Sequence, residues 1–129
     1  GLVACGQCRG GDVVRAAASG LRAKSLQGEG LGAGCYPVAI AEESVRASAR
    51  AGAVPVGDIA GMLAEMKAAA AVQRLVLETD SSPAFVLGCD QILACDEVIY
   101  SKPQEHAMAK AQLMALSGKT HQLFSAAVL

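Results

Sequence analysis

Short apolar runs typical of strands alternate along this chain with longer segments of helical periodicity. Strands are predicted at residues 35–40, 85–89, 92–95, 98–100 and 121–129. Helices are predicted at residues 42–51, 58–72 and 103–116, with an extension of the second helix to Glu78 left open. Asp58 is the expected N-cap of that second helix, and Gly118 is the expected stop of the third. Alternation of this kind predicts an α/β layer fold, and 129 residues suit a single domain.

The charge balance narrows the classes of function. Eleven Lys and Arg residues stand against twelve Asp and Glu residues, which gives a net charge of −1. Such a balance predicts neither a nucleic-acid partner nor a membrane-surface partner. It leaves room for a small anionic substrate, because a few lysines in a cleft create a local positive field without changing the total. The longest uncharged run, residues 30–41, contains glycines and a proline and is too short to span a bilayer.

The five cysteines are odd in number and lie partly in apolar segments. They are Cys5, Cys8, Cys35, Cys89 and Cys95. This pattern does not resemble a disulfide framework, so we expect reduced thiols and a cytoplasmic location. The first two cysteines have the spacing of a redox or half-zinc motif, but no second Cys/His pair completes a zinc site. The first residues also lack the basic and apolar regions of a signal peptide.

Asp90 is the first candidate for chemistry, because it directly follows the apolar strand predicted at residues 85–89. In open α/β sheets, ligands gather beyond the carboxyl ends of the strands. A carboxylate at such a place can hold a metal ion or take a proton from water. The alternative interpretation is a turn-forming aspartate that separates two strands.

Lys102 is the second candidate. It lies in the segment Ser101-Lys102-Pro103, directly before a predicted helix, where the proline fixes the backbone. A lysine beside a helix amino terminus suits phosphate oxygens. The alternative is an ordinary solvated lysine.

Three further charged residues are candidates of the same kind. Lys67 lies near the edge of the apolar face of the helix at 58–72, from which it can reach either solvent or a cleft. Glu42 and Glu43 open the helix at 42–51 and could supply a second carboxylate. The alternative for the two glutamates is charge complementarity with the helix dipole.

Three linked segments together resemble the Maf family of nucleotide pyrophosphatases. Residues 86–91, 101–103 and 115–121 read VLGCDQ, SKP and ALSGKTH. They are similar, in order and spacing, to a G-A-D-T/Q strand end, a G-K-P loop and an L-S-G-R/K-T-H segment of that family. Residues 37–43 and 64–68 resemble its strand with an Asp-Glu pair and its A-x-x-K-A helix. The resemblance covers roughly residues 18–129.

The resemblance implies an elongated mixed β-sheet flanked by helices, with a central cleft. It also implies hydrolysis of a nucleoside triphosphate to the monophosphate and pyrophosphate with a divalent cation, Mg²⁺ or Mn²⁺. Asp90 would be the base or the metal-bound carboxylate that activates water, and Glu42 or Glu43 would assist with the metal. Lys67 and Lys102 would neutralise charge on the phosphates.

The resemblance also suggests residues that bind substrate. In the family, a loop with the pattern S-x-S-x-x-R holds phosphates, and Ser19 and Arg22 are its preferred counterparts here. That loop is short in this chain, and the alternative match at residues 2–9 replaces both serines. Gln91 resembles the family branch that acts on methylated guanosine triphosphate, whereas threonine there is typical of the pyrimidine branch. The base preference stays open.

Other departures from the family pattern leave a second function open. Ser101 replaces the glycine of the G-K-P loop, residues 1–17 match poorly, and the carboxyl-terminal part of the family domain is absent. We therefore expect a single but truncated Maf-like domain. The alternative to an active pyrophosphatase is a catalytically impaired protein that binds nucleotides or regulates cell division. A homodimer is an open possibility.

Overall fold

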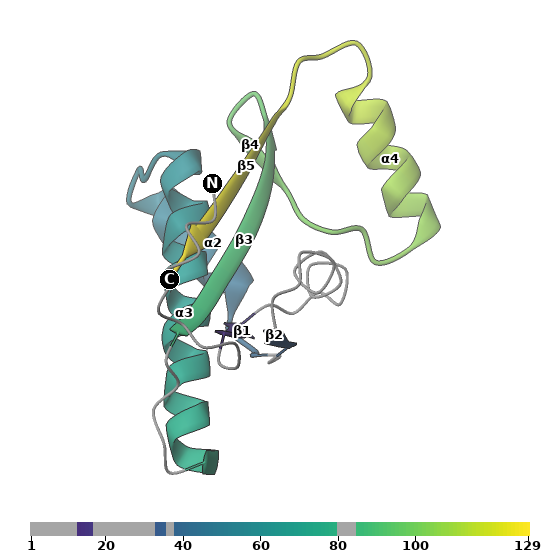
Figure 1. Ribbon diagram of the computed structural model, residues 1–129. Coiled ribbons are helices and arrows are strands. Elements are labelled where there is room, and N and C mark those ends of the chain that lie inside the picture. Colours follow the sequence, from purple (N-terminus) through teal and green to yellow (C-terminus); the bar gives the residue numbers. More distant parts are fainter. Residues whose placement is uncertain (1–12, 17–32, 36–37, 80–84) are drawn as a thin grey trace, which may run out of the picture. The chain divides into compact units, whose positions relative to one another are not determined.

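The structure is a computed structural model that describes residues 13–16, 33–35, 38–79 and 85–129 (Figure 1). Residues 13–16 and 33–35 are described by their backbone alone. Ser19, Arg22, Cys5 and Cys8 lie outside the described residues. None of the described helices is both long and apolar enough to cross a membrane.

The described strands form one mixed sheet. They are β1 (Val13–Ala16), β2 (Ala33–Cys35), β3 (Phe85–Cys95), β4 (Val98–Tyr100) and β5 (Gln122–Val128). Strand β1 runs parallel to both β2 and β3, whereas β3 and β4 are antiparallel, and β5 pairs with β3. The order is β2-β1-β3-β4, with β5 off this path. The predicted α/β class with a mixed sheet is therefore confirmed, and the central cleft stays a prediction.

Helix α2 (Glu42–Ala51) has the predicted bounds, and Glu42 and Glu43 lie in its first turn. Helix α3 (Val56–Thr79) is longer than predicted. It begins two residues before Asp58, so the predicted N-cap at Asp58 is wrong: that residue lies in the first turn instead. The extension to Glu78 occurs because no Gly or Pro interrupts residues 64–78.

The bounds of two further elements differ from their predictions. Helix α4 (His106–Leu116) begins three residues after Pro103, with Glu105 at its N-cap, and Gly118 follows it with a φ of 73°. The strand predicted at 35–40 is wrong in its bounds, because β2 ends at Cys35 and residues 38–40 have no regular structure. The sequence has a proline at position 37, which cannot donate to a ladder, so a strand through residues 35–40 was unfavourable.

The residues divide into two compact units. The first unit comprises residues 1–40, 64–89 and 127–129, and the second comprises residues 41–63 and 90–126. Helix α3 and strand β3 each contribute residues to both. The expectation of a single Maf-like domain over residues 1–129 stays a prediction.

The core of the first unit forms where α3 meets β3. Its buried members are Ala71, Leu75 and Val86, with Val38 and Ala68 packed against them. Gly88 makes the close approach possible: a Cβ on it would overlap the Ala64 carbonyl oxygen and would lie 2.9 Å from the Ala68 Cβ. The strand backbone therefore lies directly on the helix, which only glycine allows at this position.

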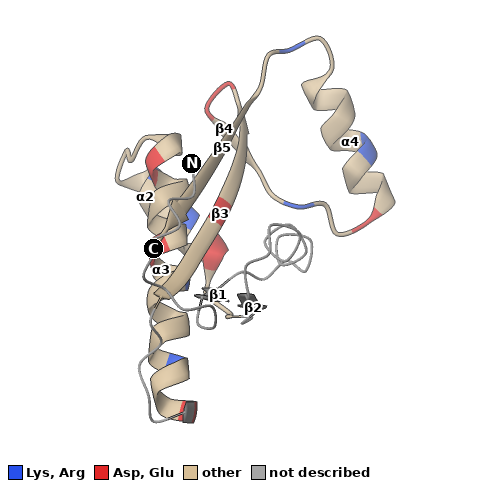
Figure 2. Ribbon diagram, in the orientation of Figure 1, with Lys and Arg blue, Asp and Glu red and all other residues tan. Residues whose placement is uncertain are grey.

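The second unit is organised around the β3–β4 hairpin. Asp96 and Glu97 join the two strands with φ values of 50° and 64°, the positive values that a type I′ turn requires. Figure 2 shows the acidic tip that these two residues form. Arg50 of α2 donates to the Glu97 carbonyl at 2.7 Å and pairs with its carboxylate at 3.3 Å, and Lys119 lies 3.4 Å from Asp96. The strand predicted at residues 98–100 is confirmed, and it pairs antiparallel with residues 93–95 of β3.

Candidate active site

Asp90 lies inside strand β3 and not at a strand end. Because alternate residues of a strand point to opposite faces, Val86, Gly88, Asp90, Ile92 and Ala94 all lie on the buried face. The prediction of two strands separated at Asp90 is therefore wrong. The reason is that Gln91 continues the alternation as an exposed residue, so the apolar period does not break at the aspartate.

The burial of Asp90 marks it as a candidate functional residue. Only 5% of Asp90 is exposed. Carboxylates are rarely buried to this degree unless they are paired with another group or belong to a functional site. It follows residues 85–88, which pair with β1, and precedes residues 93–95, which pair with β4. It therefore lies between the stretch of β3 that pairs with β1 and the stretch that pairs with β4.

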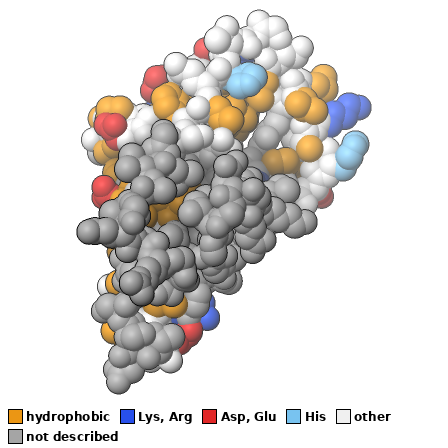
Figure 3. Space-filling view, in the orientation of Figure 1, with side chains coloured by type: hydrophobic (Ala, Val, Ile, Leu, Met, Phe, Trp, Pro, Cys, Tyr) orange, Lys and Arg blue, Asp and Glu red, His pale blue; other side chains and the backbone are white. Residues whose placement is uncertain are grey.

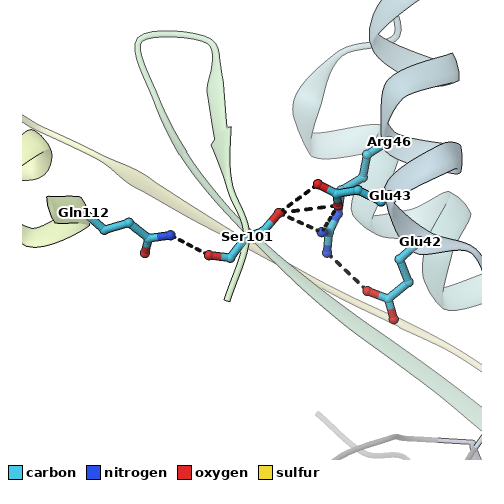
Figure 4. A network of polar contacts seen from close by, with 5 residues as sticks. All are labelled: Glu42, Glu43, Arg46, Ser101 and Gln112. Atoms are coloured by element: carbon cyan, nitrogen blue, oxygen red, sulfur yellow. Dashed lines mark hydrogen bonds and ion pairs between the residues drawn. The ribbon is translucent and has the colours of Figure 1, made fainter. Parts of the chain in front are cut away.

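A polar network surrounds Ser101, the residue that directly precedes Lys102 (Figure 4). The Ser101 hydroxyl donates to the Glu43 carboxylate at 3.2 Å and accepts from Arg46 Nη1 at 3.4 Å. Arg46 also pairs with Glu42 at 3.2 Å and with Glu43 at 3.1 Å. Gln112 of α4 donates to the Ser101 carbonyl at 2.6 Å. The network thus ties α2, the end of β4 and α4 to one residue.

Lys102 itself is exposed and forms no ion pair with any residue that the structure describes. It lies in the irregular segment between β4 and α4, four residues before the helix begins. The prediction that it sits beside a helix amino terminus is therefore wrong by one turn, because Pro103 does not open the helix. Its ammonium group is available to an anionic ligand from solution.

Lys67 lies on the buried stripe of α3. Val56, Ile59, Leu63, Lys67, Ala71 and Leu75 recur at helical spacing as its buried residues. Only 5% of Lys67 is exposed, so it does not lie at the edge of the apolar face as predicted. Met62 and Met66 of the same helix are 39% and 40% exposed. Lys67 belongs to the first unit, whereas Asp90, Lys102, Glu42 and Glu43 belong to the second.

Gln91 lies on the face of β3 opposite to Asp90, since it is the next residue of the strand. Its side-chain Nε2 donates to the Ser125 hydroxyl of β5 at 2.9 Å. The side chain therefore links two strands. Its role in substrate binding stays a prediction, as do those of Ser19 and Arg22, which lie outside the described residues.

The described residues contain no group of three or more His, Cys, Asp and Glu side chains arranged to hold a metal ion. Glu42 and Glu43 instead share the Arg46 guanidinium, whose side chain is only 16% exposed. The carboxylates of Asp90, Glu42 and Glu43 still fit a nucleotide enzyme that depends on magnesium. Mg²⁺ in these sites is usually bound by one or two carboxylates together with substrate phosphates and water, and not by an all-protein cage. Asp90 is a carboxylate of the required kind.

Arg46 and Gln112 are the residues of this site that the sequence reasoning missed. A signal for Arg46 was present, because it stands four and three residues after Glu42 and Glu43, which is the spacing of helical ion pairs. No sequence signal indicated Gln112, since its contact with the Ser101 carbonyl depends on where α4 lies.

The comparisons with known proteins identify the class. The chain matches the family model for Maf-like proteins over residues 12–129. The chain belongs to the Maf-like protein family. The resemblance inferred from three short segments is thereby confirmed.

Several relatives are similar over most of this chain. It is 37% identical over 117 residues to the 7-methyl-GTP pyrophosphatase of Mesorhizobium japonicum. It is 41% identical over 118 residues to nucleoside triphosphate pyrophosphatase 1 of a Jannaschia species. Both matches cover 91% of this chain and 56% of the relative. The chain therefore spans little more than half the length of these relatives.

Proposed function

We propose that the protein carrying this chain hydrolyses a nucleoside triphosphate to the monophosphate and pyrophosphate with the help of a divalent cation. The observation that carries the proposal is the burial of Asp90, at 5% exposure, within the long strand of a Maf-like chain. The names of the relatives, which are nucleoside triphosphate pyrophosphatases and 7-methyl-GTP pyrophosphatases, support the reaction class.

In the proposed reaction, Asp90 takes a proton from the attacking water. The water oxygen forms a bond to the α-phosphorus. The anhydride bond between the α- and β-phosphates breaks, and the electron pair of that bond leaves with pyrophosphate. Phosphoryl transfer of this kind needs little covalent help but needs cations around the transferring group. Lys102 and Lys67 are the proposed cations, and Ser19 and Arg22 are proposed to hold the phosphates.

The divalent cation, Mg²⁺ or Mn²⁺, would supply charge neutralisation on the phosphate oxygens. Asp90 is the proposed protein ligand, with phosphate oxygens and water completing the shell. Glu42 or Glu43 is proposed to assist, which requires that its carboxylate exchange Arg46 for the metal. Glu43 is the more available of the two, because 78% of its side chain is exposed against 34% for Glu42.

A second candidate is a protein that binds nucleotides without turnover. The pairing of Glu42 and Glu43 with Arg46 favours it, because carboxylates already neutralised by an arginine are weaker metal ligands. We propose the cytoplasm as the location on the ground of the cysteine pattern. Homodimer formation stays a prediction.

The test is pyrophosphate release from a panel of nucleotides that includes 7-methyl-GTP, GTP, UTP and CTP, with Mg²⁺ or Mn²⁺. The proposal expects stoichiometric pyrophosphate and monophosphate from at least one nucleotide, and loss of release when the cation is removed with a chelator. Tight binding of a nucleotide without release would favour the second candidate. A protein that neither binds nor hydrolyses any of these nucleotides would contradict both candidate functions.

A further inference from the structure

Ser101 is held at two of its polar groups by two different helices. Its hydroxyl contacts Glu43 and Arg46 of α2, at 3.2 and 3.4 Å, and its carbonyl accepts from Gln112 of α4 at 2.6 Å. All these residues belong to the second unit. The backbone on the amino-terminal side of Lys102 is therefore fixed by contacts that do not involve Lys102.

Two of these contacts involve a charged group and are long, at 3.2 and 3.4 Å, whereas the contact of the carbonyl with Gln112 is short, at 2.6 Å. Arg46 is itself held by Glu42 and Glu43, at 3.2 and 3.1 Å, with its side chain only 16% exposed. Figure 4 shows Arg46 between these carboxylates and Ser101, so ion pairs within α2 hold the guanidinium that the Ser101 hydroxyl contacts.

A lysine in an irregular segment gains from such support. Binding an anion with Lys102 costs the conformational freedom of its side chain and of the backbone that carries it. Contacts that fix the preceding residue remove part of that cost before the ligand arrives, which is the general advantage of preorganisation. The side chain of Lys102 stays exposed, so the support does not block it.

We propose that Ser101, with Arg46 and Gln112, forms a latch that positions Lys102 for the phosphates of the nucleotide. Glu43 belongs to the same latch because its carboxylate accepts a hydrogen bond from the Ser101 hydroxyl. These are positioning residues, which act on the ligand through Lys102. The inference rests on the proposed function, since it takes the nucleotide phosphates as the ligand.

The experiment is a double-mutant cycle on the affinity for the nucleotide that the parent binds best, measured by calorimetry with a non-hydrolysable analogue. Ser101→Ala removes both hydroxyl contacts and is expected to weaken binding about fivefold to tenfold. Ser101→Thr keeps a hydroxyl and should restore most of the affinity. Gln112→Ala removes the carbonyl contact and should weaken binding to a similar degree. Ser48→Ala, an exposed serine of α2 outside the latch, is the matched control and should bind like the parent.

The decisive comparison is made in a Lys102→Ala background. If the latch acts through Lys102, Ser101→Ala should change affinity less than twofold there, because the group that it positions is gone. An equal loss in both backgrounds would overturn the proposal, as would an unchanged affinity of Ser101→Ala in the parent. A parent that binds no nucleotide would instead refute the proposed function, so the two failures can be told apart.

Hydrogen exchange gives a readout that does not depend on any nucleotide. In the free protein, Ser101→Ala and Gln112→Ala should each speed amide exchange in residues 99–104, while Ser101→Thr and Ser48→Ala should leave it unchanged. Unchanged exchange in Ser101→Ala and Gln112→Ala would mean that the segment before α4 is not held by these contacts, and the latch would be excluded.

Discussion

Gly88 shows how a single missing side chain sets the packing inside the first unit. The Cβ of an alanine here would overlap the Ala64 carbonyl oxygen and lie 2.9 Å from Ala68, and a helix backbone cannot give way easily. We expect Gly88→Ala to lower the free energy of unfolding by roughly 1–3 kcal/mol or more, the usual cost of overpacking. Urea unfolding followed by circular dichroism measures the loss.

Gly61→Ala is the matched control for that change. Gly61 lies in the interior of α3, and a Cβ there would meet nothing within 4 Å. The alanine should therefore stabilise the helix by roughly 0.5–1 kcal/mol, because glycine loses more backbone freedom on folding. Two substitutions of the same type should thus shift the urea midpoint in opposite directions. A shift in the same direction would contradict the packing described for Gly88.

Individual residues of the candidate site were only partly predictable from sequence. Asp90 could be singled out, since an acidic residue interrupts a strongly apolar stretch, but its place on the buried face depends on β3 running on to Cys95. The burial of Lys67 was missed because its aliphatic stem allows both a buried and a solvated position. Arg46 forms contacts with Ser101, which is distant in sequence, and no local pattern indicates such a contact.

Among the elements, the β3–β4 hairpin carries backbone strain at its tip. Glu97 has a φ of 64°, a conformation that costs a residue with a side chain roughly 1–2 kcal/mol. Glu97→Gly removes that cost and loses an exposed ion pair with Arg50 worth only about 0.2–1 kcal/mol, while the carbonyl contact with Arg50 remains. The urea midpoint should therefore rise.

Glu97→Ala separates the two effects. It loses the same ion pair but keeps the left-handed backbone, so its urea midpoint should equal that of the parent or lie slightly below it. Equal stability of the glycine and alanine variants would contradict the claim that the positive φ of residue 97 destabilises the hairpin.

The elements with strong local signals were predicted best. Helix α2 has the predicted bounds, because acidic residues mark its start and Gly52 marks its end. Helix α3 is longer than predicted. Its second half is rich in alanine and has a weak apolar period, so the end of the helix could not be inferred from the sequence. Helix α4 buries no residue, and Leu113 and Met114 are 71% and 69% exposed, so apolar composition alone did not predict its environment. Figure 3 shows apolar side chains of this kind at the surface of the described part.

At the scale of the whole molecule, all five cysteines are expected to be thiols. Cys89 and Cys95 are free in the described part of the chain, and Cys95 is buried, with its Sγ 3.5 Å from the Thr120 carbonyl oxygen. A thiol count on denatured, unreduced protein should return five, the number of cysteines in the sequence. A count of three would indicate one disulfide, with Cys5 and Cys8 as the first pair to examine.

The central claim is that Asp90 performs the chemistry of a nucleotide pyrophosphatase, and the most direct test compares Asp90→Asn with the parent. The asparagine keeps the shape of the side chain but removes its charge and basicity. Loss of a general base typically costs about 10²–10⁴ in rate. Pyrophosphate release should therefore fall by that factor in a variant that circular dichroism shows to be folded, while the exposed control Asp58→Asn should keep full turnover. An Asp90→Asn protein that releases pyrophosphate as fast as an active parent would contradict the account.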